Sequence, residues 1–137
     1  MAKTKLELYQ GTNKIVKCGV YEDLRYYIKD GKICPLAYIS LSYSSPHIDK
    51  SYDDIDVDCH GGLTYSGELY DHEGNKVENF VIGWDYGHCG DFVVADAILG
   101  NIFQTMNLLQ EVHKWTIEEI ENEIKVVINK HKNYLTI

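Results

Sequence analysis

The chain has 137 residues, with 21 acidic against 13 basic side chains and a formal net charge of −8 at pH 7. This length is typical of one hydrophobic core, so we expect a single domain over residues 1–137. The acidic balance disfavours direct binding to nucleic acid or to an anionic membrane surface. No stretch has the apolar length of a signal peptide or a membrane span, which predicts a cytoplasmic protein without membrane contact.

The first part of the chain carries the pattern of short strands. Residues 14–21 and 33–42 are rich in β-forming side chains, and Asp30-Gly31 predicts a turn just before the second of them. The stretch YEDLRYYIK between them fits either a short helix or a strand. Loop chemistry follows in SYSSPHIDKSYDD, where serines, a proline and aspartates break the periodicity.

Residues 54–60 alternate strictly between apolar and polar side chains. Ile55, Val57 and Cys59 would share one face of a strand, and the opposite face would be acidic and carry His60. After Gly61-Gly62, the segment LTYSGELY continues in the same pattern, DHEGN supplies a turn and KVENFVIGWDY runs back. This pattern predicts a long hairpin.

The carboxy-terminal part of the chain changes to helical periodicity. Thr116 and Glu119 have the spacing of a capping box, so we predict a helix over 116–133, with Glu121 and Lys125 as an i,i+4 pair. Residues 102–113 fit a second helix. Strands followed by helices indicate an α+β fold, a mainly antiparallel sheet with a long central hairpin covered by one or two C-terminal helices.

The hairpin would bring two polar, glycine-rich stretches together, DIDVDCHGGLTYS and GWDYGHCGD. If the turn is centred near Gly74, paired residues have numbers that add up to roughly 147–148. His60 then lies across from Gly87 or His88. We therefore expect the two stretches to form two walls of one site.

One interpretation of this site is a metal centre. His60, Asp85, His88 and Asp91 supply ligand types that Zn²⁺ or Mn²⁺ accepts, and two histidines with one carboxylate form a known catalytic set. No tight ligand motif such as H-E-x-x-H is present in the sequence. A site without a cofactor is the other interpretation.

In that second interpretation the site recognises a small molecule. Glycine-flanked turns present backbone N–H groups to phosphate or carboxylate oxygens, and aromatic rings stack on flat groups. Cys59 and Cys89 would lie across from each other, as buried apolar side chains or as reactive thiols. The candidate ligand-binding residues are Asp58, His60, Gly61, Gly62, Thr64, Tyr65, Ser66, Trp84, Asp85, His88 and Asp91.

The same motifs carry a resemblance to a known family. YDDIDVDCHGGLTYSG followed by IGWDYGHCGDF is similar to small, mostly uncharacterised phage and bacterial proteins with paired D-x-D-V-x-x-H-G-G-L-T-x-S-G and G-x-D-x-x-H-x-G-D motifs. The resemblance covers residues 33–133 and implies a phage or mobile-element setting, in which the protein would act in the host cytoplasm and counter host defence. It implies no mechanism.

Three functions follow as expectations. The first is a homo-oligomeric anti-defence protein that binds and sequesters a nucleotide-derived immune signal without converting it. The second is a metal-dependent hydrolase that acts on a nucleotide or another phosphoester. The third is an acidic mimic of nucleic acid that inhibits a host nuclease. Whether the protein is an enzyme is left open by the sequence.

Overall fold

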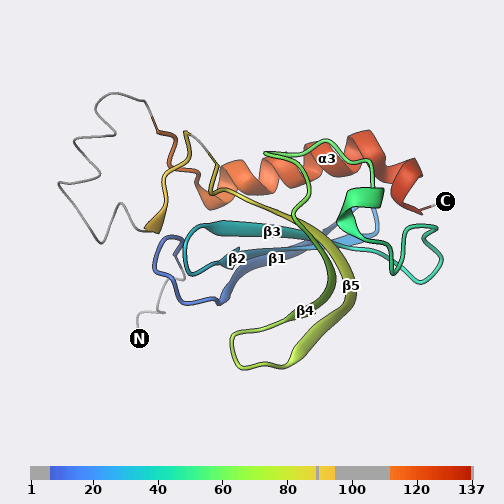
Figure 1. Ribbon diagram of the computed structural model, residues 1–137, viewed down its shortest axis with the longest axis horizontal. Helices are drawn as coiled ribbons and strands as arrows, with labels where there is room; N and C mark the ends of the chain where they lie inside the picture. The colour runs from blue at the N-terminus through green and yellow to red at the C-terminus, as the bar shows by residue number, and fades with distance from the viewer. Residues whose placement is uncertain (1–6, 89, 95–111, 137) are drawn as a thin grey trace.

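The computed structural model describes residues 7–88, 90–94 and 112–136. These residues form a five-stranded antiparallel sheet of order β1-β2-β3-β5-β4 with a long helix on one face (Figure 1). The predicted α+β fold is confirmed. The elements are β1 (Ile15–Tyr21), β2 (Leu24–Asp30), β3 (Pro35–Ser40), the 3-10 helix η1 (Tyr52–Asp54), β4 (Tyr65–Tyr70), β5 (Lys76–Asp85) and α3 (Ile117–Thr136).

The ambiguous stretch after β1 is a strand, β2. Leu24, Tyr26 and Ile28 are buried on one side of β2, and Arg25 and Tyr27 alternate with them on the other. This period of two is the pattern of a sheet with two chemically different faces. Strand β2 lies between β1 and β3, so its backbone is paired along both edges.

The hairpin of β4 and β5 has the predicted register. Tyr65 pairs with Gly83 and Ser66 with Ile82, and both pairs add up to 148. The turn between the strands contains Gly74 at φ +86, a conformation that favours glycine. The Asp71 carboxylate accepts hydrogen bonds from backbone N–H groups within this turn and holds it closed.

The prediction of a strand over 54–60 is wrong, although its alternation is real. Ile55 and Val57 are buried and the aspartates beside them are exposed, but the segment forms no sheet ladder. It runs across α3 instead (Figure 1). Tyr134 Oη accepts from the backbone N–H of Asp56 at 2.9 Å, and His131 Nε2 accepts from that of Asp58 at 3.0 Å. Side chains of α3 thus accept the backbone hydrogen bonds that the carbonyl groups of a neighbouring strand would accept in a sheet.

Helix α3 begins with the predicted capping box. The Glu119 N–H donates to Thr116 Oγ1 at 3.1 Å, and the Thr116 N–H donates to the Glu119 carboxylate at 3.0 Å. The predicted pair of Glu121 with Lys125 does not form. Glu121 accepts from the Tyr26 hydroxyl, and Lys125 lies over the ring of Tyr21, because both residues face strands of the sheet.

The second predicted helix, 102–113, falls outside the described residues except for its last two. Of these, His113 forms an isolated parallel bridge with Asp91. This bridge places the segment that leads into α3 beside the polar stretch that follows β5.

The core lies between α3 and the sheet. Ile28, Ile39 and Ile82 from three neighbouring strands are wholly buried, as are the helix residues that pack in the same cluster, Ile120, Ile124 and Ile128. Burying an isoleucine stabilises the fold by about 1.5–3 kcal/mol. No helix among the described residues has the length and apolar character needed to cross a membrane.

Candidate metal centre

The two polar stretches meet at the end of β5. The ring centroids of His60 and His88 are 5.5 Å apart and the ring planes cross at 79°. The expected juxtaposition of these imidazoles is therefore confirmed. It arises beyond the paired part of the hairpin, because the ladder of β4 and β5 ends at Tyr65 and the chain on both sides then turns toward α3.

His60, His88 and Asp91 form a compact set of possible metal ligands. Each offers one donor atom, and the three donor atoms lie within 4.8 Å of one another. His60 Nε2 is 2.6 Å from Asp91 Oδ2, and His88 Nδ1 is 3.9 Å from the same oxygen. Because Zn–N and Zn–O bonds are about 2.0–2.2 Å long, the donors of a tetrahedral site lie roughly 3.4 Å apart. Small side-chain shifts would close the set around an ion.

The Nδ1 atom of His88 distinguishes this set from an ordinary polar network. It is buried and has no hydrogen-bond partner among the described residues. Two carboxylates face it without bonding to it, Asp85 Oδ1 at 3.4 Å and Asp91 Oδ2 at 3.9 Å. A buried ring nitrogen without a partner is unfavourable, and a cation between it and the Asp91 oxygen would remove that cost.

The Asp91 carboxylate is held on both oxygens. Oδ2 accepts from the backbone N–H of His88 at 3.0 Å, and Oδ1 accepts from the indole N–H of Trp115 at 3.0 Å. The side chain is 4% exposed, so these bonds lie away from solvent. The indole of Trp115 thus orients the Asp91 carboxylate without being a ligand itself, as outer-shell hydrogen-bond partners do in metal sites. Its position just before the cap of α3 gave no sign of this role in the sequence.

The His60 ring is held by stacking. It lies nearly parallel to the ring of Tyr86, with centroids 4.7 Å apart and 11° between the planes. The Tyr86 hydroxyl donates to Glu123 on α3 and accepts from the indole of Trp84. Burial and the hydrogen bond to Glu123 raise the pKa of Tyr86, so the phenol stays neutral and holds its place.

Gly61 allows His88 to approach. A Cβ built on Gly61 would overlap the imidazole of His88, whereas a Cβ on Gly62 would meet nothing within 4 Å. Both glycines have positive φ, +69 and +83. Only Gly61 is therefore required by close packing on the candidate ligand, while the turn itself favours glycine at both positions.

Several residues expected in the site lie apart from it. Asp58 is exposed and pairs with Lys130 at 2.6 Å, and Trp84 is buried in the core. Tyr65 contacts Tyr38 edge-on, on the face of the sheet turned away from α3. The Thr64 N–H donates to the Gly83 carbonyl at the start of β4, and Ser66 lines a different, open cavity beside η1. The structure thus gathers His60, Gly61, Asp85, His88 and Asp91, with Gly62 adjoining them.

The thiols near the site are not poised as nucleophiles. Burial raises the pKa of Cys59 to about 12 and that of Cys34 to about 11. Cys59 packs against the core, which favours the apolar reading of this residue. The expected pairing of Cys59 with Cys89 falls on a residue outside the described part of the chain.

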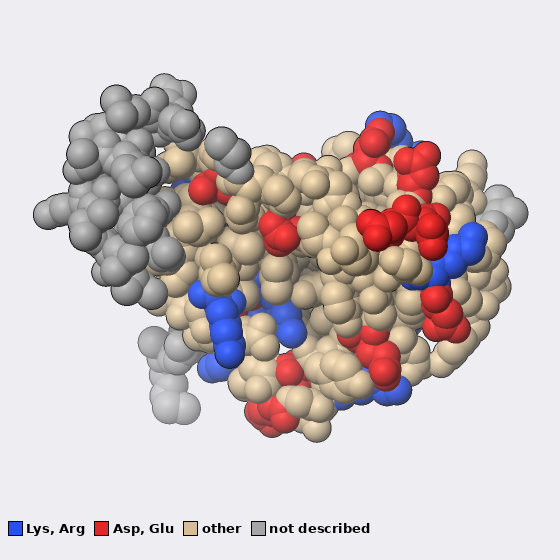
Figure 2. Space-filling model, in the orientation of Figure 1, with Lys and Arg blue, Asp and Glu red and all other residues tan. Residues whose placement is uncertain are grey.

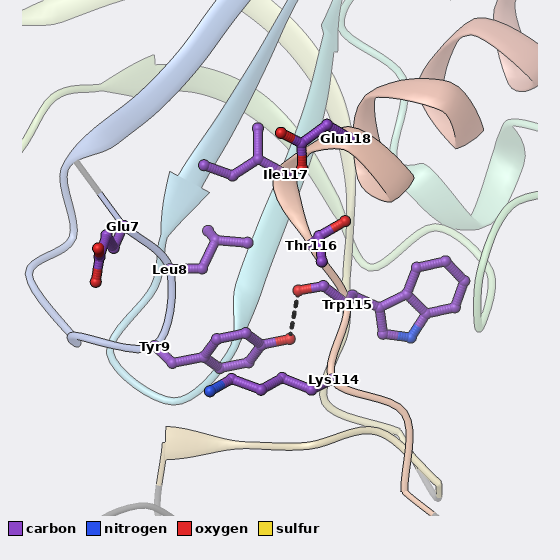
Figure 3. Close-up of a pocket in the computed structure, with 8 residues that line it drawn as sticks. All are labelled: Glu7, Leu8, Tyr9, Lys114, Trp115, Thr116, Ile117 and Glu118. Atoms are coloured by element: carbon purple, nitrogen blue, oxygen red, sulfur yellow. Dashed lines mark hydrogen bonds between the residues drawn. The ribbon is translucent and has the colours of Figure 1, made fainter. Parts of the chain in front are cut away.

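A cavity of about 290 Å³ adjoins the site on the far side of Trp115. Leu8, Tyr9 and Ile117 form its apolar walls, and the Tyr9 hydroxyl donates to the Trp115 carbonyl at 3.0 Å (Figure 3). The Trp115 indole points away from Leu8 and Ile117, toward the side on which it meets Asp91. One residue therefore contributes to the cavity wall and to the orientation of a candidate ligand.

The acidic surface is separate from this site. Figure 2 shows Asp and Glu side chains gathered over the end of the molecule that carries η1, where Asp53, Asp54 and Asp56 are exposed. Basic side chains stand among them (Figure 2). Asp58, which follows Asp56 in the sequence by two residues, pairs with Lys130. The charged end and the histidine cluster are thus two distinct features.

Nitrogen and oxygen donors of this kind suit Zn²⁺, Mn²⁺ or Fe²⁺. Three protein ligands leave at least one coordination position open, which is the arrangement of catalytic rather than structural zinc. His88 and Asp85 are about a third exposed, so solvent reaches this edge of the cluster. Comparisons of the chain with protein-family models, with curated proteins and with solved structures found no match.

Proposed function

We propose that the protein is a metal-dependent hydrolase that acts on a nucleotide or another phosphoester. The observation that carries this proposal is the convergence of one donor atom each from His60, His88 and Asp91 within 4.8 Å, together with a buried Nδ1 atom of His88 that has no hydrogen-bond partner among the described residues. Two imidazoles and one carboxylate with an open side match the donor sets of hydrolytic zinc and manganese sites.

In this proposal His60, His88 and Asp91 would hold the ion, and Asp85 would act as a general base beside it. Such an ion lowers the pKa of a bound water and polarises a phosphoryl oxygen. Asp85 Oδ1 is fixed by the Gly87 N–H at 3.1 Å, and the carboxylate lies beside the donor nitrogen of His88 without being one of the three clustered ligands. Its position suits a general base that takes a proton from the attacking water.

The test is hydrolysis of chromogenic phosphate mono- and diesters and of cyclic nucleotides by protein reconstituted with Zn²⁺ or Mn²⁺. Wild type should turn over at least one of these substrates, and a chelator should abolish the activity. Asp91→Asn should lose metal and activity together, whereas Asp85→Asn should keep the metal and lose about 10²–10⁴-fold in rate. Asp58→Asn is the matched control, because that exposed carboxylate pairs with Lys130.

Absence of turnover by a fully metallated wild type, or equal rates for wild type and Asp85→Asn, would contradict this assignment. Loss of activity in Asp58→Asn to the same degree as in Asp91→Asn would also contradict it, because the effect would then not come from the cluster.

Ligand sequestration is the second candidate, and the cavity beside Trp115 favours it. Its walls combine apolar Leu8 and Ile117 with one basic and two acidic side chains, Lys114, Glu7 and Glu118, a composition suited to a small ligand that has an apolar part and polar groups. A nucleotide-derived signal recovered intact after heat denaturation of the protein would support sequestration, and a converted product would support hydrolysis. The phage setting and the homo-oligomer stay predictions.

A further inference from the structure

The cavity beside Trp115 has a buried apolar part and a charged rim. Leu8 and Tyr9, each 8% exposed, form the buried part, and Ile117 lies across from Leu8 (Figure 3). The rim carries three exposed charged side chains, Glu7, Lys114 and Glu118. A volume of about 290 Å³ lies at the small end of ligand pockets, so the cavity suits a molecule of about one ring with a polar substituent.

The position of Tyr9 in the cavity wall is fixed by the fold itself. Its backbone has φ +68, in the left-handed region that few residues other than glycine adopt. The Asp30 carboxylate, 1% exposed, holds the turn that follows Tyr9 by accepting hydrogen bonds from the backbone N–H groups of residues 10–12 at 2.9 to 3.3 Å. The wall is therefore preformed, as in most small-molecule sites.

The same wall supports the candidate metal ligand Asp91. The Tyr9 hydroxyl donates to the Trp115 carbonyl at 3.0 Å, and the Trp115 indole donates to Asp91 Oδ1 at 3.0 Å. The Tyr9 ring also packs edge-on against Phe92, the residue after Asp91, with ring centroids 5.3 Å apart. Two sets of contacts thus connect the cavity wall with the Asp91 carboxylate. A molecule that restricts Tyr9 and Trp115 would therefore restrict Asp91.

We propose that this cavity binds a small ring-shaped molecule with one polar group, and that the bound molecule increases the metal affinity of the candidate metal centre. The ligand would pack on the cavity walls and reduce the motion of Tyr9 and Trp115. Part of the entropy cost of ordering Asp91 would then be met before the ion binds. The increase in metal affinity rests on the metal centre of the proposed hydrolase, whereas the binding of the ligand does not.

The charges at the rim determine which polar group the ligand can carry. Lys114 Nζ lies 5.2 Å from the centroid of the Tyr9 ring and 5.0 Å from that of Phe92. Glu118 lies on the other side of the cavity from Lys114 (Figure 3). Groups of both signs thus flank the apolar part, so an anion, a cation and a neutral amide each meet a complementary side chain. Matched probes that differ only in this group identify the preferred one.

The first measurement uses the full-length, zinc-free protein, titrated with benzamide, benzoate and benzylamine and followed by NMR. Wild type should bind at least one of these probes, and the bound probe should slow the exchange of the Trp115 indole proton with solvent, because the indole is held more firmly. Ile117→Trp, which fills the cavity, should abolish the binding. Val126→Trp, at a position 62% exposed on the same helix, is the matched control and should leave the binding unchanged.

The second measurement is the zinc affinity with and without the probe that binds most tightly. We expect the probe to raise the zinc affinity about 5-fold or more, within the usual range of coupling between two sites. Linkage requires that zinc raise the affinity for the probe by the same factor. Tyr9→Phe keeps the ring and loses the hydrogen bond to Trp115, so it should bind the probe and show a smaller increase.

Failure of wild type to bind any of the probes at millimolar concentration would overturn the proposal, as would equal binding by wild type and Ile117→Trp. A probe that binds without changing either the indole exchange or the zinc affinity would overturn the coupling. A wild type that binds the probe and protects the indole proton but retains no zinc would support the ligand site and contradict the hydrolase.

Discussion

The imidazole of His88 packs directly against the backbone of Gly61, so closely that a side chain at position 61 would occupy the space of the ring. This contact makes a glycine part of the support of a candidate metal ligand. It also offers a sharp comparison, because Gly62 next to it has the same left-handed conformation and faces open space.

Gly61→Ala should therefore weaken zinc binding by about 10–100-fold, the range typical of lost outer-shell support. Gly62→Ala should suffer a similar backbone strain and retain the zinc affinity of wild type. Competition with a chromogenic chelator measures both constants, and thermal melting shows whether the two variants are equally stable. Equal zinc affinity in the two variants would mean that the contact with His88 does not position the ligand.

Trp115 should tune the same centre through Asp91. Trp115→Phe removes the indole N–H that donates to Asp91 Oδ1 and keeps an aromatic ring. We expect zinc affinity to fall by about 10–100-fold. Tyr9→Phe, which removes only the bond to the Trp115 carbonyl, is the control and should bind zinc normally. An unchanged affinity in Trp115→Phe would show that Asp91 needs no support from the indole.

Glu78 should make the stability of the fold depend on acid pH. Hydrogen bonds from Arg25, Tyr27 and Ser40 hold the pKa of Glu78 below its ordinary value, against the effect of burial. The carboxylate therefore stabilises the fold above the ordinary glutamate pKa of about 4.3, and this contribution is lost as the pH falls through the lower pKa of the folded state. Urea unfolding at pH 7 and at steps below pH 5 measures it.

Glu78→Gln should be less stable than wild type at pH 7 and should approach it as the pH falls below about 4. Glu68→Gln, at an exposed pair with Lys76, is the control and should change stability little. A constant difference between Glu78→Gln and wild type across this pH range would contradict the assigned ionisation.

The buried thiols should resist alkylation. The pKa values of about 12 for Cys59 and about 11 for Cys34 leave little thiolate at pH 8, and Cys18 is exposed on β1. Iodoacetamide labelling of the native protein, read by peptide mass spectrometry, should modify Cys18 well before the other two. Early labelling of Cys59 would show that this thiol is accessible and ionised.

The elements that could be predicted are those whose partners lie nearby in the sequence. The turn around Gly74 and the alternation on either side of it determine the register of β4 and β5. The capping box is also local, because Thr116 and Glu119 are one turn apart. The register of the hairpin also predicts that His60 and His88 lie close together, although neither residue belongs to the sheet ladder.

What could not be predicted depends on partners far along the chain. The alternation of residues 54–60 fits a strand, but their backbone donors bond to His131 and Tyr134, more than 70 residues away. Trp115 supports Asp91 through a single hydrogen bond from its indole N–H. A single contact between residues so far apart in the chain produces no spacing or motif that the sequence could reveal. The close contact between Gly61 and the His88 ring likewise depends on the direction of the turn at Gly61-Gly62, which only the packed structure shows.

The most direct measurement is the zinc content of the purified protein after loading with Zn²⁺ and desalting, determined by mass spectrometry of the metal. Wild type should retain one zinc ion per chain and His88→Ala should lose it. His72→Ala, in the exposed turn of the hairpin, should retain as much as wild type. A wild-type protein that retains no zinc, or a His88→Ala variant that retains as much as wild type, would contradict the metal centre.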